Sequence, residues 1–124
     1  MIKNLQLILV FTLVLSSNVS IASEWYEGGT LHQATVDTWS HSSYSNRLAT
    51  SGDWFIRISK AYNPELKRKI DALPNSQYLP TLKKFSAQLE KCVSDTINIE
   101  SFSKESDKAA EIASICYVTM YSSE

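Results

Sequence analysis

Apolar side chains recur at spacings of three and four residues in three long stretches of the chain, and this spacing predicts three amphipathic helices. The first helix follows a cap at Ser42 or Ser43, the second opens at Pro80, and the third follows a cap at Ser103. The positions predicted to face the core are Tyr44, Leu48, Phe55, Ser59 and Tyr62 in the first helix, Leu82, Phe85, Leu89, Cys92 and Thr96 in the second, and Ala109, Ile112, Ala113, Cys116 and Met120 in the third. We therefore expect an all-α fold, a small helical bundle in which short helices accompany the three long ones.

A leading helix is predicted before the three long ones. Thr30 follows two glycines, and Gln33 lies three residues further on, which is the pattern of a capping box. This pattern predicts a helix that begins at Leu31 and ends near residues 40–42.

A short helical insert is predicted from Glu65 to Leu73. Asn63 is a favourable cap, and Pro64 suits the first helical position.

Gly52 lies in the middle of the first long helix, where glycine costs about 1 kcal/mol relative to alanine. We expect Gly52 to mark a close crossing with a neighbouring helix.

The first 22 residues have the layout of a secretory signal peptide. Lys3 provides the positive start, an apolar stretch runs from Leu5 to Leu15, and small residues precede a cleavage point after Ala22. An uncleaved anchor is the alternative, but a spanning helix needs about 20 apolar residues. We expect a signal peptide over 1–22, a single helical domain over 23–124, a periplasmic location and no stable membrane insertion after cleavage.

Cys92 and Cys116 are the only cysteines, and both lie on predicted core faces of consecutive long helices. Helices joined by a short loop pack antiparallel, so a bond between the two cysteines is geometrically reasonable. An even number of cysteines in a small exported domain predicts a structural disulfide. The alternative is a pair of free thiols for redox chemistry, but such pairs usually stand as close together as in C-x-x-C.

Composition narrows the class of function. Twelve basic residues face thirteen acidic ones, which disfavours a strongly basic nucleic-acid binder, and 44% of residues are hydrophobic, which disfavours an acidic disordered tail. The one basic cluster is Lys67-Arg68-Lys69. It is either a solvated helix face or a contact for an anionic membrane or an acidic partner.

Catalytic and metal-binding patterns find little support. The sequence holds neither G-x-S-x-G nor a phosphate-cradling glycine loop. Asp37 and His41 have the i, i+4 spacing of two metal ligands, but a closed site needs about four, and the alternative is a surface pair. We expect no enzymatic activity, no catalytic residue, no metal and no cofactor.

The predicted helix start at Gly28-Gly29-Thr30 is a candidate ligand site. Free amide groups at a helix N-terminus can bind a carboxylate or a phosphate. The residues expected to contact such a ligand or a partner are Trp25, Tyr26, Gly28, Gly29, Thr30 and His32. The alternative is an ordinary cap with an aromatic arm packed over the bundle.

The run EWYEGGTLHQAT (residues 24–35) followed by Trp39, and the run SYSNRLAT (residues 43–50) followed by Asp53 and Trp54, resemble small exported proteins of Gram-negative bacteria. These carry the pattern W-Y-x-G-G-T-L-H-x-A-T and have no assigned activity. In architecture alone, the chain is also similar to the HdeA-type acid-stress chaperones of the periplasm. It departs from them because both cysteines lie in its last third.

Taken together, these patterns indicate a non-enzymatic exported protein that acts by protein–protein contact with an unidentified protein partner and does not bind nucleic acid. Two alternatives remain open. One is an acid-stress holdase chaperone, loosened when its carboxylates are protonated. The other is a binder of small anionic ligands at Gly28-Gly29-Thr30.

Overall fold

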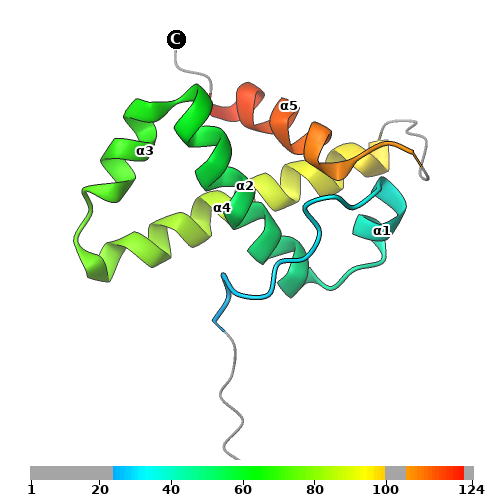
Figure 1. Ribbon diagram of the computed structural model, residues 1–124, viewed down its shortest axis with the longest axis horizontal. Helices are drawn as coiled ribbons and strands as arrows, with labels where there is room; N and C mark the ends of the chain where they lie inside the picture. The colour runs from blue at the N-terminus through cyan, green and yellow to red at the C-terminus, as the bar shows by residue number, and fades with distance from the viewer. Residues whose placement is uncertain (1–23, 100–105, 122–124) are drawn as a thin grey trace, which may run out of the picture.

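The computed structural model describes residues 24–99 and 106–121, and over these ranges the chain forms five helices joined by short segments. They are α1 (Val36–Ser40), α2 (Tyr44–Tyr62), α3 (Pro64–Asp71), α4 (Asn75–Ile99) and α5 (Ala109–Tyr121). The expected all-α fold with three long helices, here α2, α4 and α5, is confirmed within those ranges (Figure 1). The expected signal peptide and Ser103 itself lie outside the described residues. The prediction that the third long helix follows Ser103 directly is wrong, because α5 begins only at Ala109 and residues 106–108 are not helical.

The long helices pack on one another, and the short ones close the two ends. α4 packs against both α2 and α5, and α5 runs back alongside α4, while α3 links α2 to α4 at one end and α1 lies at the other (Figure 1). The segment before α1 pairs with the segment before α5. The amide of Val36 donates to the carbonyl of Asp107 at 2.9 Å, and the amide of Ala109 donates to the carbonyl of Ala34 at 3.1 Å.

An aromatic cluster joins the three long helices. Phe55 of α2 stacks on Phe85 of α4 with ring centroids 5.0 Å apart, and Tyr117 of α5 lies 5.7 Å from Phe55. The Tyr117 hydroxyl donates to Ser59 Oγ at 2.8 Å, so this buried phenol has a partner. Burial raises the pKa of Tyr117 and raises that of Tyr121 to about 12.

The disulfide prediction is confirmed. Cys92 of α4 is bonded to Cys116 of α5, with a Cα–Cα distance of 6.0 Å. The bond fastens two antiparallel helices at their packed faces, as the helical spacing of the two cysteines suggested.

Several local predictions are also confirmed. Ser43 caps α2 by accepting from the amide of Asn46, and Asn63 caps α3 by accepting from the amide of Leu66, with Pro64 in the first turn. Gly52 does mark a crossing with α4, because a Cβ there would stand 3.2 Å from Ser86 Oγ.

The predicted capping box is wrong. The leading helix, α1, begins at Val36 rather than Leu31. Its cap is Thr35, whose side chain accepts from the amide of Thr38 at 3.2 Å. A single turn does form, because the amide of Ala34 donates to the carbonyl of Leu31 at 3.1 Å, but the turn does not continue into a helix. The amide of Val36 donates instead to the carbonyl of Asp107, far along the chain, so the reason is tertiary.

The predicted start of the second long helix is also wrong. α4 begins at Asn75, and Pro80 lies inside it. The carbonyl of Pro74 accepts from the amides of Gln77 and Tyr78, at 2.8 and 3.1 Å, and these bonds close the first turn. Pro74 therefore opens α4 as well as following α3.

Three positions predicted to face the core are exposed instead: Tyr44, Tyr62 and Met120. The two tyrosines are the first and last residues of α2. The other core positions predicted in α5 are confirmed as buried, and Tyr117 is buried beside them; the confirmed positions are Ala109, Ile112, Ala113 and Cys116. Because α5 is apolar on nearly all sides, spacing alone did not distinguish the buried Tyr117 from the exposed Met120.

Candidate functional site

The arm, residues 24–35, is fastened along α2 by backbone and side-chain hydrogen bonds. The Thr30 amide donates to Asn46 Oδ1 at 2.9 Å, and Asn46 Nδ2 donates back to Thr30 Oγ1 at 2.8 Å. The Leu31 amide donates to Thr50 Oγ1 at 3.2 Å. The candidate residue Thr30 is therefore part of the attachment of the arm to α2.

The two glycines of the candidate site allow the arm to turn and to pack closely against α2. Gly28 has a φ of 79°, a left-handed conformation that favours glycine. At Gly29 a Cβ would stand 2.8 Å from the backbone nitrogen of Thr50, so only glycine fits against α2. Both glycines shape a turn and a close approach rather than a helix start.

The expected anion site at Gly28-Gly29-Thr30 thus lacks its structural basis. The following helix starts at Val36, and the amide of Thr30 is already engaged. The hollow beside Gly28 is lined by the carboxylates of Glu24 and Glu27, which repel an anion.

His32 completes the attachment of the arm. Its Nε2 lies 2.8 Å from Asp53 Oδ2 on α2, and both side chains are partly exposed. The contact joins residues 21 positions apart in the sequence, so no local pattern could have revealed it. His32 is consequently an anchor of the arm rather than a free ligand-binding group.

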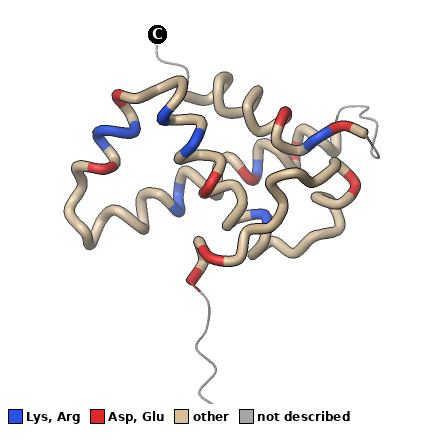
Figure 2. Tube along the Cα trace, viewed as in Figure 1, with Lys and Arg blue, Asp and Glu red and all other residues tan. Residues whose placement is uncertain are grey.

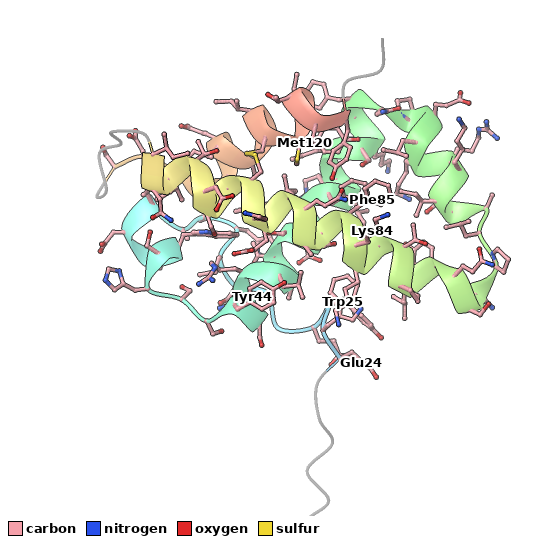
Figure 3. All side chains as sticks on the ribbon, turned by 180° about the vertical axis from the view of Figure 1, so that it is seen from behind. Glu24, Trp25, Tyr44, Lys84, Phe85 and Met120 are labelled. Atoms are coloured by element: carbon pink, nitrogen blue, oxygen red, sulfur yellow. A yellow bond between two sulfur atoms is a disulfide. The ribbon has the colours of Figure 1, made fainter. Side chains whose placement is uncertain are left out.

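Trp25 and Tyr26, the aromatic members of the predicted site, line a hollow that we call the arm groove. Its volume is about 420 Å³, and its walls come from the arm, α2 and α4. The lining residues are Trp25, Tyr26, Gly52, Asp53, Ile56, Tyr78, Leu79 and Leu82. Figure 3 shows Trp25 turned toward the helices and Glu24 turned away from them.

Gly52 leaves room for the Trp25 ring to pack against α2 and form a wall of this groove. A Cβ at Gly52 would stand 3.2 Å from Cζ3 of the Trp25 indole, which is tighter than ordinary packing. The Trp25 and Tyr26 rings meet edge to face at 5.7 Å. The same glycine therefore serves both the α2–α4 crossing and the docked tryptophan.

A second apolar hollow lies on the outer side of α5, and we call it the α5 face. It has a volume of about 310 Å³. Its lining residues are Tyr62, Ser114, Ile115, Val118 and Thr119. The chain carries no charged residue from Ile112 to Tyr121, and Figure 2 shows α5 uncharged beyond its first turn.

A buried charge network was not foreseen from the sequence. Glu90 of α4 is only 6% exposed, and its Oε1 accepts from Arg47 Nε at 2.9 Å and from Ser94 Oγ at 2.8 Å. Trp39 Nε1 in turn donates to Ser94 Oγ at 3.1 Å, and the Trp39 ring stacks on Trp54 at 5.1 Å. The network joins α1, α2 and α4 around one carboxylate.

The basic cluster Lys67-Arg68-Lys69 on α3 is paired with acidic neighbours. Lys67 Nζ contacts Asp71, and Arg68 and Lys69 lie 3.1 and 3.9 Å from Glu65 Oε1. These pairs favour the interpretation of the cluster as a solvated face.

Asp37 and His41 form an exposed pair, with Oδ1 and Nδ1 3.4 Å apart. No third side chain joins them, because the described ranges hold no group of three or more His, Cys, Asp or Glu that could share a metal ion.

None of the helices formed by residues 24–99 and 106–121 is both long enough and apolar enough to cross a membrane. Comparison of the chain with protein-family models, with curated proteins and with solved structures finds no match.

Proposed function

We propose that this chain is an exported, non-enzymatic protein that acts by binding another protein through the α5 face. The observation that carries the proposal is that α5 is apolar on several sides while the bundle covers only one. Ile115 is 66% exposed and Tyr62 is 68% exposed. A helix that is apolar all round is ordinarily buried, and clustered exposed apolar residues mark interaction sites.

The chemistry of the α5 face indicates the kind of partner. Its lining is uncharged, so a charged group placed there would lose its hydration without gaining an ion pair. A volume of about 310 Å³ is suited to apolar side chains of a partner. We therefore propose that the partner presents an uncharged apolar surface.

The Cys92–Cys116 bond supports the exported part of the proposal, because such bonds persist in oxidising compartments. The layout of residues 1–22 supports it as well. Proteolysis at Ala22, read by sequencing the N-terminus of the protein recovered from the periplasm, tests this part separately.

The test of the α5 face compares two isoleucine variants. Ile115→Glu places a charge on the face, where Ile115 is 66% exposed, and Ile99→Glu places the same charge at an isoleucine that is 82% exposed at the end of α4. The full chain, tagged at its C-terminus, is crosslinked in intact periplasm, and the captured protein is then purified for direct binding measurements. We expect one stoichiometric partner that binds the wild type and Ile99→Glu but not Ile115→Glu.

Other outcomes would overturn the proposal in distinct ways. Equal binding by both variants would exclude the α5 face as the contact surface. Capture of many different proteins after acid shock would favour the holdase alternative. Capture of none at either pH would exclude action by protein contact.

A further inference from the structure

We propose that the arm groove binds a small organic cation with an apolar body, such as a quaternary ammonium or an alkylammonium compound. The arm groove and the α5 face have no lining residue in common, so this inference stands independently of the proposed protein contact.

The walls of the arm groove match such a ligand. Trp25, Tyr26 and Tyr78 supply aromatic rings, and a cation within about 6 Å of a ring face is attracted by the ring quadrupole. Ile56 and Leu82 supply apolar surface for the body of the ligand. The volume of about 420 Å³ falls within the usual range of small-molecule sites, which is roughly 300–1,000 Å³.

The charge of the groove favours a positively charged ligand. Asp53 is the one charged residue among those that line the groove, and no Lys or Arg lines it. Its Oδ2 is engaged by His32, whereas a carboxylate can accept hydrogen bonds at both oxygens. The contact with His32 orients the Asp53 side chain, and the second carboxylate oxygen can still accept from a ligand.

The groove is formed before any ligand arrives. Gly29 packs against the backbone of α2, Thr30 exchanges two hydrogen bonds with Asn46, and Gly52 leaves room for the Trp25 ring. A preformed site avoids part of the entropy that ordering a loop on binding would cost.

The experiment compares three ligands that share a benzyl group and differ in charge: benzyltrimethylammonium, benzyl alcohol and phenylacetate. Each is titrated into the purified, disulfide-bonded protein, and the dissociation constant is measured from the indole NMR signal of Trp25. We expect the cation to bind at least about fivefold more tightly than the alcohol, as cation–π attraction beside a carboxylate implies. Phenylacetate is expected to bind most weakly of the three.

Asp53→Asn and Asp71→Asn separate charge at the groove from charge elsewhere. Both aspartates are 46% exposed and both are ion-paired, but Asp71 lies on α3 outside the groove. Asp53→Asn keeps a group that can accept from His32, so the arm stays anchored. We expect it to weaken binding of the cation about fivefold or more while leaving binding of the alcohol unchanged, and Asp71→Asn to change neither.

A second variant, Tyr78→Leu, removes one ring without touching the arm and is expected to weaken the cation selectively. The proposal is overturned if the cation and the alcohol bind equally, if none of the three binds at millimolar concentration, or if Asp53→Asn and Asp71→Asn behave alike. Because Ile115→Glu leaves the groove intact, it should retain cation binding, so failure here and failure of the α5 face are distinguishable.

Discussion

His32 Nε2 lies 2.8 Å from Asp53 Oδ2, and this contact ties the N-terminal arm to the middle of α2. The same aspartate is the charged member of the arm groove. Asp53 therefore takes part both in the attachment of the arm and in the charge of the groove.

Gly29→Ala tests the close approach of the arm to α2. The new Cβ would stand 2.8 Å from the backbone nitrogen of Thr50, and backbone cannot move aside cheaply. We expect the free energy of unfolding, measured in urea, to fall by about 1–3 kcal/mol. Ser45→Ala, an exposed change nearby, is the control; equal stability of the two variants would contradict the packing described.

Glu90→Gln tests the buried charge network. The substitution leaves the largely buried guanidinium of Arg47 without its counter-charge, so we expect a loss of about 2–4 kcal/mol in urea unfolding. Asp95→Asn, which breaks the exposed pair with Lys91, is the control and should leave stability unchanged. A similar effect of the two variants would show that Glu90 carries no special role.

The raised pKa of Tyr121 predicts that the free energy of unfolding falls at alkaline pH. Burial raises its folded-state pKa to about 12, above the value of about 10 expected for the unfolded chain. The stabilisation is therefore complete below about pH 10 and is lost as the pH rises through about 12. Tyr121→Phe should flatten the fall in stability over that window, whereas Tyr62→Phe, at an exposed position, should not.

The disulfide closes a loop whose ends are 24 residues apart in sequence, which is worth about 3 kcal/mol in the chain-entropy model. We expect the double variant Cys92→Ala with Cys116→Ala to lose about that amount in urea unfolding. The helical signal in circular dichroism should persist, because each helix keeps its other packed residues. Collapse of the helical signal in the absence of denaturant would contradict this expectation.

The sequence predicted best what local chemistry decides. Caps at Ser43 and Asn63 depend on hydrogen bonds three residues away, and the pairing of Cys92 with Cys116 follows from helical spacing. The helix predicted to begin at Leu31 is wrong because the amide of Val36 donates to the carbonyl of Asp107, far along the chain, instead of continuing the turn.

Two further features that the sequence did not reveal have the same kind of cause. Arg47 and Glu90 are 43 residues apart, and nothing local marks a glutamate that will be buried. The arm groove brings the aromatic residues of the arm next to Asp53 of α2, and the sequence alone did not place the arm beside α2. In each case the packing of distant segments decided the outcome.

The backbone bonds between the segments before α1 and α5 have a consequence for the order of folding. The carbonyl of Ala34 accepts from the amide of Ala109, and Ala109 is synthesised after α4. A nascent chain therefore holds the Ala34–Val36 segment without its final backbone partner. Truncation before Asp107 should therefore expose the segment around Ala34–Val36 to proteases, whereas residues 30–32 keep their bonds to α2.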